Sequence, residues 1–297
     1  MDPREVVDDV WCIDGEMMDK GVLSVYLVAD NDPTLIDAGT AKSFDTIQSG
    51  ISELGMDVND IENIVVSHVH VDHSGSVGDL LAVAPDTTVY IHESTAPHLA
   101  DPERLIESSG RGLGEYFHSM GEQASVSEKR ITPIPAEGMS LDIGDRTLGI
   151  EPVPGHSPDH VVMYMPESAV LFAGEAIGYY FERSDTWLPP ATIPNFDVEQ
   201  VTDAIETLQS LNPQHIELAH FGEWEGTSKK AFSLAEKRLA FFDERITTLF
   251  KQHEDVAATE QAVADELLDL TPAYNPMVEG LYARLLTQGY LLYYDWI

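Results

Sequence analysis

The feature that most constrains this 297-residue chain is a cluster of histidines directly after a mainly apolar segment. Residues 61–67 have the composition of a strand buried on both faces of a sheet. The chain then runs into HVHVDH at residues 68–73, and Gly75 allows a tight turn into the next helix. Because functional loops of open α/β sheets follow the ends of strands, the cluster predicts a site at a sheet edge.

Three imidazoles and one carboxylate within these six residues indicate a divalent metal site. Clustered histidines repel one another when protonated and gain little without a metal, whereas neutral imidazole and carboxylate are good ligands for divalent cations. His68 and His70 point to the same side if the backbone stays extended. Asp72 and His73 lie past the bend, where they can face a second cation.

The rest of the pattern predicts an α/β fold, because segments with strand character alternate with segments of helical period. Strands are expected at 10–17, 21–28, 34–37, 61–67, 87–92, 216–219 and repeatedly within 131–172, and helices at 43–54, 76–84 and 198–211.

Three segments depart from this alternation. Residues 94–126 look mainly helical and polar, which predicts an insertion over the sheet. Residues 177–196 are rich in aromatics and prolines and are expected to form an irregular loop that covers a site. From residue 227 onward the pattern is helical, with a break around 271–276. We therefore expect one domain over 1–226 and a helical extension over 227–297, packed on that domain or on a second subunit.

The balance of charge is strongly acidic. Aspartate and glutamate number 52 against 16 lysines and arginines, a formal net charge of −36 that makes nucleic acid an improbable partner. Scattered acids with sparse lysine indicate a halophilic protein from a salt-rich cytoplasm, and a very acidic mesophilic protein is the alternative.

The single cysteine, Cys12, excludes an intrachain disulfide and a thiolate metal cluster, and is expected to be a small buried residue. The N-terminus lacks the pattern of a secretory signal, and no apolar stretch approaches the roughly 20 residues that span a bilayer. We expect a soluble, cytoplasmic protein without a membrane partner.

The segment HVHVDHSG resembles the HxHxDH signature of the metallo-β-lactamase superfamily. Other motifs of this family follow in the expected order: LIDAG at 35–39, PGHS at 154–157, LFAGE at 171–175 and AHFG at 219–222. The resemblance covers roughly residues 10–225 and implies a four-layer αβ/βα sandwich with two metals at the mouth of the sheets. Within the superfamily the chain resembles the glyoxalase II and lactonase type, and its helical insertion and tail look similar to those of an archaeal-type branch.

The resemblance also implies a set of ligands. One metal would be held by His68, His70 and His156, the other by Asp72, His73 and His220, and Glu175 would bridge them or bind one. Asp37 would orient a ligand through a hydrogen bond, although it could instead cap the following turn. In isolation, His156 in a turn and His220 at a strand end would favour structural roles.

Glu175 departs from the family pattern, which usually has aspartate at this position. The additional methylene leaves open whether the second metal site is filled. With nitrogen and oxygen ligands only, zinc is the first choice of metal, and iron and manganese stay open.

The family mechanism implies a metal-dependent hydrolase, in which a hydroxide that bridges the metals attacks a small carbonyl or ester substrate. Thioesters or lactones are favoured, with Asp72 and Glu175 as the catalytic residues. The expected partner is a small-molecule substrate, and a homodimer stays open.

Other candidates have weaker support. Tyr179 or Tyr180 could lend a phenol to the substrate oxygen or simply pack in the loop. Arg183 could hold a substrate carboxylate or form a surface ion pair. His160 is expected to be structural or to orient a ligand. The remaining histidines lack partners in sequence and are treated as non-ligands: His92, His98, His118, His215 and His253.

Several other functions are weighed against hydrolysis. Glu175, by weakening the second site, motivates a mononuclear iron oxygenase similar to the persulfide-oxidising branch, or a scaffold in which the metal only stabilises the fold. A flavodiiron protein is disfavoured, because those proteins resemble HxExD where this chain has His70, and because no flavin domain is expected to follow. A nuclease is disfavoured by the charge of −36.

Overall fold

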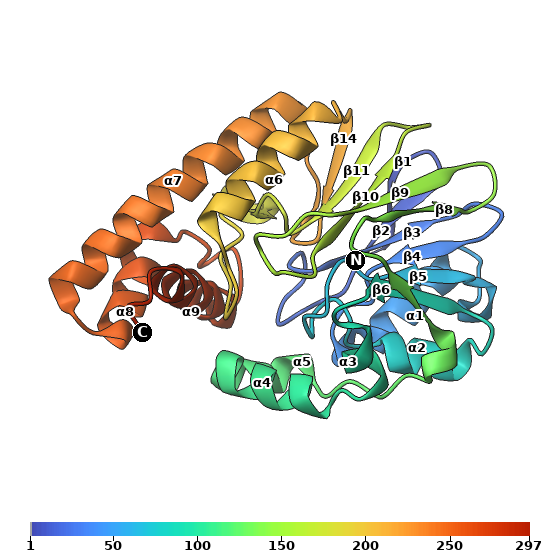
Figure 1. The fold of residues 1–297 in the computed structure, drawn as a ribbon, viewed down its shortest axis with the longest axis horizontal. Coiled ribbons are helices and arrows are strands. Elements are labelled where there is room, and N and C mark those ends of the chain that lie inside the picture. The colour runs from blue at the N-terminus through green and yellow to red at the C-terminus, as the bar shows by residue number, and fades with distance from the viewer. Residues whose placement is uncertain (1) are drawn as a thin grey trace.

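The computed structural model, which describes residues 2–297, is built on two β-sheets packed face to face (Figure 1). The first sheet runs in sequence order: β1 (Arg4–Val7), β2 (Val10–Asp14), β3 (Ser24–Val28), β4 (Thr34–Ile36), β5 (Asn63–Val65), β6 (Thr88–His92) and β7 (Ile131–Ile134). Strands β1 to β4 pair antiparallel and β4 to β7 pair parallel. The parallel part therefore places the carboxyl ends of β4, β5 and β6 at one edge.

The second sheet has the order β15-β14-β11-β10-β9-β8. Its strands are β8 (Met139–Asp142), β9 (Thr147–Pro152), β10 (Val161–Met165), β11 (Val170–Gly174), β14 (His215–Leu218) and β15 (Gly222–Glu223). Strands β11 and β14 run parallel, so the segments that follow them leave the sheet on the same side.

Alternation along the strands explains the layers. In β3, Tyr26 and Val28 belong to the apolar core between the sheets, whereas Val25 and Leu27 belong to the core under the helices. The same alternation separates Phe172 from its neighbours in β11. Helices α1 (Phe44–Glu53) and α2 (Val77–Val83) cover the outer face of the first sheet (Figure 1), and α6 (Val198–Ser210) shares the core of the second sheet's outer face. The αβ/βα sandwich expected from the sequence is confirmed.

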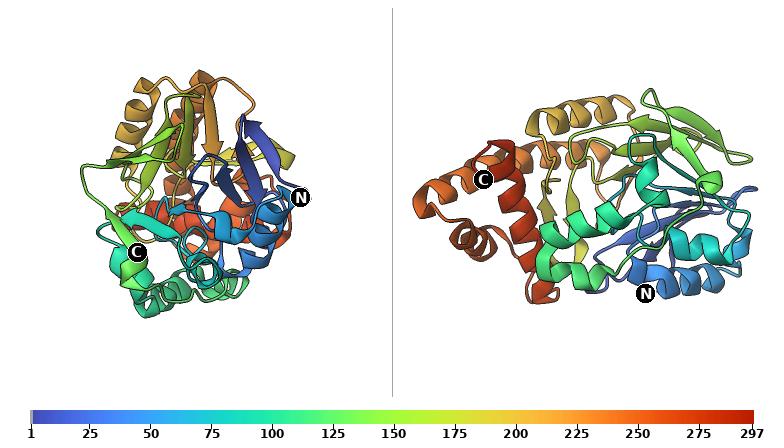
Figure 2. Two further views of the ribbon diagram at one scale, coloured as in Figure 1. Left: turned by 90° about the vertical axis from the view of Figure 1, so that its right-hand side faces the viewer. Right: turned by 60° about the horizontal axis from the view of Figure 1, so that its bottom comes forward.

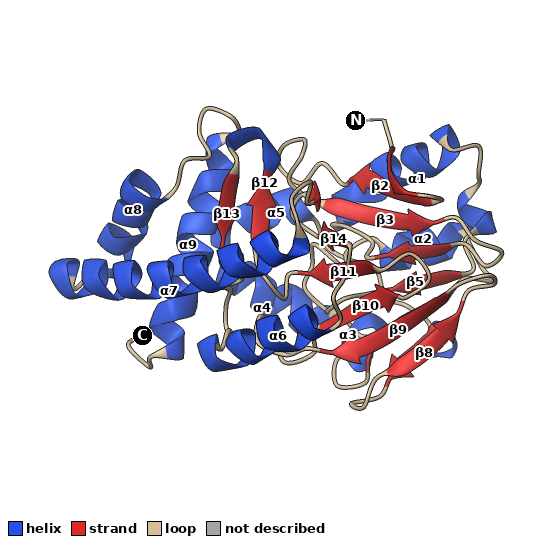
Figure 3. Ribbon diagram, turned by 90° about the horizontal axis from the view of Figure 1, so that it is seen from above, coloured by secondary structure: helices blue, strands red, loops and turns tan. Residues whose placement is uncertain are grey.

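The insertion between β6 and β7 is helical, as expected, and contains α3 (Ala96–Ala100), α4 (Glu103–Leu113) and α5 (Phe117–Met120). After the sandwich come α7 (Ser228–His253), α8 (Val256–Leu267) and α9 (Pro276–Tyr293), which lie at one end of the two sheets (Figure 3). Figure 2 shows α9 next to α4, and Arg284 Nε on α9 donates to the carbonyl oxygen of Gly112 on α4 at 2.8 Å.

Helix α9 also packs tightly on the segment before α6. A Cβ added at Gly289 would approach the carbonyl oxygen of Thr192 to 2.7 Å, and the rings of Phe196 and Tyr290 are 5.1 Å apart. The extension therefore packs on the sandwich of its own chain.

The structure corrects one expectation. Residues 177–196 were expected to be irregular, but they contain the antiparallel pair β12 (Tyr179–Phe181) and β13 (Thr186–Leu188). Aromatic residues are good strand formers, and the hairpin is paired along its full length with Tyr179 opposite Leu188. Among the described residues, no helix is both long and apolar enough to cross a bilayer.

A buried carboxyl group lies in the core between the sheets. Glu217 on β14 is completely buried, and neither carboxylate oxygen has a hydrogen-bond partner among the described residues. Burial, and then the charge of Glu223, raises the pKa of Glu217 to about 8, while Arg4 opposes this rise. Cys12 and Tyr26 face the same group, and burial also raises the pKa of Cys12 to about 12.

Glu217 should make the protein less stable as the pH rises from about 4.5 to about 8. In this range Glu217 is protonated in the folded state and ionised in the unfolded state. Its contribution to the free energy of unfolding is complete below the pKa of the unfolded state, and it is lost as the pH rises through the pKa of the folded state. Replacing Glu217→Gln should raise the melting temperature by a few degrees at pH 8.5 and change it little at pH 5.5. Equal shifts at both pH values, measured by calorimetry, would contradict this reading.

Candidate metal centre

The histidine cluster lies in the turn between β5 and α2, as the sequence predicted. Asp37 follows β4 and receives the Ser67 backbone N–H on Oδ1 at 2.7 Å, which ties the ends of the two strands together. Gly75 closes the turn, because a Cβ there would overlap the Ala41 backbone nitrogen and the Val71 carbonyl oxygen. Only glycine permits this close approach.

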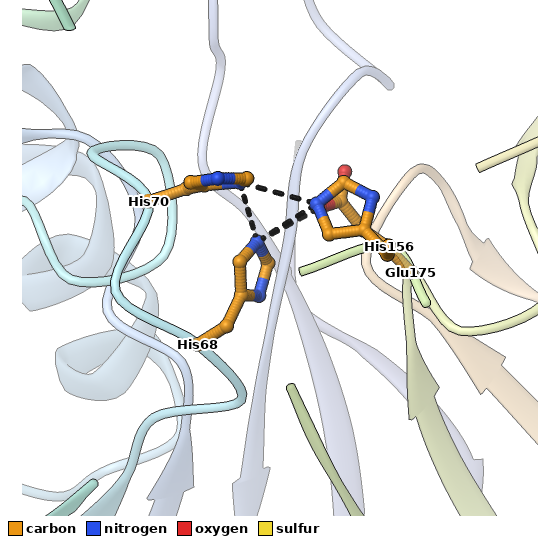
Figure 4. A group of neighbouring side chains, drawn as sticks. All are labelled: His68, His70, His156 and Glu175. Atoms are coloured by element: carbon orange, nitrogen blue, oxygen red, sulfur yellow. Dashed lines mark hydrogen bonds and ion pairs between the residues drawn. The ribbon is translucent and has the colours of Figure 1, made fainter. Parts of the chain in front are cut away.

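Three imidazoles and one carboxylate meet in the first ligand group, which comes from three separate chain segments (Figure 4). His68 Nε2 lies 2.8 Å from His70 Nδ1 and 3.2 Å from His156 Nε2. His156 Nε2 lies 3.1 Å from His70 Nδ1. Glu175 Oε2 completes the group, at 2.7 Å from His156 Nε2 and 3.0 Å from His68 Nε2.

The second group consists of Asp72, His73, Glu175 and His220. His73 Nε2 lies 3.7 Å from Asp72 Oδ2 and 3.4 Å from Glu175 Oε2. His220 Nε2 lies 3.6 Å from Asp72 Oδ2 and 3.1 Å from Glu175 Oε1. Glu175 thus belongs to both groups, and its longer side chain reaches each of them.

The donor atoms fit divalent cations. A tetrahedral ion with ligand distances of about 2.0–2.1 Å places its ligand atoms about 3.3–3.4 Å apart, close to the spacing seen here. In the first group three ring nitrogens point at one another, an arrangement that a shared cation stabilises. In the second, the buried His73 Nε2 and His220 Nε2 have no hydrogen-bond partner among residues 2–297. Such unpartnered buried nitrogens are costly unless an ion uses them.

The opposite ring nitrogens are held by fixed partners. His73 Nδ1 lies 2.9 Å from Asp37 Oδ2, and His68 Nδ1 lies 3.0 Å from Ser67 Oγ. Backbone carbonyl oxygens hold the other two rings: that of Pro190 lies 2.9 Å from His156 Nδ1 and that of Val22 2.6 Å from His220 Nδ1. These contacts fix ring orientation and direct the other nitrogen towards the centre.

The electrostatics of the two groups differ. Burial, together with the neighbouring imidazole of His156, lowers the pKa of His70 to about 4, and burial likewise holds the pKa of His68 well below its usual range. These rings are therefore neutral, with lone pairs free for a cation. Burial alone would lower the pKa of His220, but the nearby carboxylates of Asp72 and Glu175 outweigh it and raise this pKa to about 9.

The structure gives partners to several of the weaker candidates. The hydrogen bond expected of Asp37 is present, and His160 Nε2 accepts the Glu175 backbone N–H at 3.0 Å, so His160 orients that residue. Tyr180 directs its hydroxyl to Asp185, but its backbone N–H donates to the His220 carbonyl oxygen at 2.5 Å. Arg183 forms the surface ion pair, at 3.0 Å from Asp19 Oδ2.

Sequence reasoning missed two residues at the site. Asp159 receives Val69 N–H and the hydroxyls of Ser157 and Thr95, at 2.8–2.9 Å, and so joins three loops. Its place three residues after His156 was an available signal. Tyr282 on α9 lies with its hydroxyl 3.0 Å from His220 Nδ1. No local signal marks Tyr282, because only tertiary packing brings the extension to the centre.

A cavity of about 660 Å³ opens above the two groups. Its floor includes His70, Asp72, His156 and Glu175, and its walls come from α4, α9 and residues 192–195. This volume is typical of sites for small molecules.

Comparison with known proteins identifies the family. The profile of the Metallo-beta-lactamase superfamily matches residues 18–220. The chain belongs to this superfamily. The HxHxDH resemblance is thereby confirmed, and a metal site made of histidine, aspartate and glutamate side chains agrees with it.

The superfamily relatives include an archaeal protein with a similar overall structure. The metallo-beta-lactamase fold-containing protein ST1585 from Sulfurisphaera tokodaii is 25% identical over 207 residues, which cover 68% of this chain and 73% of the relative. The crystal structure titled as ST1585 from Sulfolobus tokodaii superposes with a TM-score of 0.71 at 18% identity, covering 96% of this chain and 98% of that one.

Another relative is named for a different activity. Anaerobic nitric oxide reductase flavorubredoxin from Pectobacterium carotovorum subsp. carotovorum (strain PC1) is 30% identical over 159 residues, 52% of this chain. The chain matches only 27% of that protein, and between 26% and 35% of the first three curated relatives.

Asp37→Asn should weaken metal binding without unfolding the protein. The amide lacks the charge that orients and polarises His73, so affinity for Zn²⁺ should fall by roughly 10–100-fold. Competitive titration with a chromogenic chelator measures this affinity. The exposed Asp86→Asn is the matched control, and equal affinity in the two variants would remove Asp37 from this role.

Proposed function

We propose that this protein is a metal-dependent hydrolase that acts on small carbonyl or ester substrates, with thioesters or lactones favoured. The observation that carries the proposal is the pair of adjacent ligand groups that share Glu175 at the floor of a cavity. Membership of the superfamily, with relatives named as probable metallo-hydrolases from Bacillus subtilis, supports it.

In the proposed site, His68, His70 and His156 would hold one cation and Asp72, His73 and His220 the other, and Glu175 belongs to both ligand groups. Bound divalent metals supply Lewis-acid polarisation of the substrate oxygen and lower the pKa of water. The protein's own groups then position the reactants. Asp72 is about one-fifth exposed and faces the cavity, so its carboxylate is placed to accept a hydrogen bond beside the scissile bond.

Tyr282 is proposed to donate a hydrogen bond to the substrate oxygen. When His220 uses Nε2 as a metal ligand, its Nδ1 carries the ring proton and donates a hydrogen bond to the Val22 carbonyl oxygen, 2.6 Å away. The Tyr282 hydroxyl, 3.0 Å from this Nδ1, then has no lone pair to donate to. Tyr282 lines the cavity, and burial raises its pKa well above the usual range, so its proton stays available for substrate.

The hydrolase proposal is tested by metal analysis together with panels of thioesters and lactones. We expect turnover by the metal-loaded enzyme. His68→Ala should lower metal affinity and turnover. The loss should exceed the roughly 10–100-fold that follows when a hydrogen-bond partner of a metal ligand is removed. The exposed His253→Ala is the control and should match the parent protein. Absence of turnover for every ester class at full metal occupancy would refute the proposal.

Tyr282→Phe should reduce kcat by about 10–100-fold with little change in KM or metal content, because the lost hydrogen bond acts on charge that develops in the transition state. Tyr180→Phe is the control, since its hydroxyl binds Asp185 and does not line the cavity. Steady-state kinetics on one thioester compares the variants. An unchanged kcat in Tyr282→Phe would exclude this role.

An iron-dependent oxidoreductase is the second candidate, and the flavorubredoxin relatives are the observation that favours it. The form weighed from the sequence is a mononuclear iron enzyme that oxidises a persulfide. Oxygen uptake with glutathione persulfide by iron-loaded protein would support it. A zinc-loaded enzyme that hydrolyses esters and is inert to oxygen would eliminate it.

We further propose zinc as the metal and a salt-rich cytoplasm as the setting. The nitrogen and oxygen donors support zinc, and the net charge of −36 supports the setting. The boundary near residue 226 and a homodimer also stay proposals.

A further inference from the structure

The upper wall of the cavity belongs to elements outside the metal-binding motifs. Helix α4 of the insertion and helix α9 of the extension, which are neighbours in the fold (Figure 2), both contribute residues to it. They contribute apolar side chains, as does the loop before α6: Leu105, Leu113, Leu281, Leu285, Leu292 and Ile193. The part of the substrate that extends away from the metals therefore meets an apolar surface.

Two arginines line the same wall, in a chain with only 16 lysines and arginines. Arg111 is paired with Glu107 of its own helix, at 2.5 Å. Arg104, one turn before the middle of α4, is an exposed residue whose side chain lines the cavity and forms no ion pair or hydrogen bond with residues 2–297, although the chain carries 52 acidic residues.

The acidic groups of the cavity do not compensate Arg104. Asp72 and Glu175 belong to the ligand groups, and Glu107 is paired with Arg111. Asp159 already accepts hydrogen bonds from three donors. Arg104 is therefore the one cation lining the described cavity that has no acidic partner.

We propose that the substrate carries an anionic group, a carboxylate or a phosphate, separated from the scissile carbonyl by an apolar segment, and that Arg104 binds this anion. The guanidinium fork matches both groups, and the leucines of α4 and α9 contact the segment between. A local cation is needed here because the net charge of the protein repels anions. This inference rests on the proposed hydrolase function.

The test compares three thioesters that share a six-carbon acyl chain. The hexanoyl thioester of N-acetylcysteamine is neutral, the adipoyl thioester places a carboxylate at the acyl end, and hexanoyl 2-mercaptoethyl phosphate places a phosphate on the thiol side. Hydrolysis of each consumes one water and releases an acid and a thiol. We expect kcat/KM about tenfold higher for at least one anionic thioester than for the neutral one at low salt. The anionic thioester with the higher kcat/KM shows whether the preferred group is a carboxylate or a phosphate, and whether it lies on the acyl or the thiol side of the scissile bond.

Arg104→Ala should abolish this preference, Arg104→Glu should reverse it, and Arg104→Lys should retain part of it. Arg238→Ala is the matched control, because Arg238 lies on α7 against Phe241 and Phe242 and does not line the cavity. Added KCl should reduce the preference of the parent protein, since the attraction is screened. An equal kcat/KM for all three thioesters, or a preference that survives in Arg104→Ala, overturns the inference.

The two proposals fail in distinguishable ways. If thioesters are hydrolysed without regard to charge, the anion inference fails and the hydrolase proposal stands. If none of the three is hydrolysed, the same compounds serve as ligands in isothermal titration calorimetry. Tighter binding of an anionic thioester that is lost in Arg104→Ala then supports the anion site, and equal binding refutes it.

Discussion

The structure depends on the convergence of five imidazoles around one buried carboxylate. Four of them contact Glu175, namely His68, His73 and His156 through Oε2 and His220 through Oε1, and His70 belongs to the same ligand group. Burying this charge without partners would be costly, and burying several ring nitrogens with their lone pairs directed at one another would be costly as well. Divalent cations satisfy both sets of groups at once. Without bound cations, the free-energy cost of this convergence must be offset by the apolar side chains buried in the two cores of the fold.

The two sheets make the convergence possible, because they bring the ends of several strands to one edge. Asp37 follows β4, the histidine cluster follows β5, Glu175 follows β11 and His220 follows shortly after β14. Parallel pairing of β4 with β5 and of β11 with β14 puts these side chains next to one another. Each position is then fixed by a hydrogen bond from a neighbouring loop, as between His160 and Glu175.

The helical parts of the chain give the centre its surroundings. The insertion and the extension meet through Arg284 and the Gly112 carbonyl oxygen, and between them they form the apolar wall of the cavity. The extension also reaches the ligands, since Tyr282 contacts His220. The appended helices therefore shape the cavity while all residues of the two ligand groups come from the sandwich.

Sequence alone was sufficient for the fold class and for the side chains that gather at the centre. Local patterns, namely strand and helix periods and glycines at turns, indicated the α/β class and the cluster at residues 68–73. The resemblance to a known family was needed to add His156, Glu175 and His220. Only the tertiary structure decided the rest. It set the pairing of the hairpin β12–β13 and the surroundings of Asp159, Tyr282 and Arg104. Their neighbours are distant in sequence, and their roles come from packing, from hydrogen bonds between loops, and from the absence of an acidic partner. Such relations leave no local pattern, because they depend on where the folded chain places each group relative to the others.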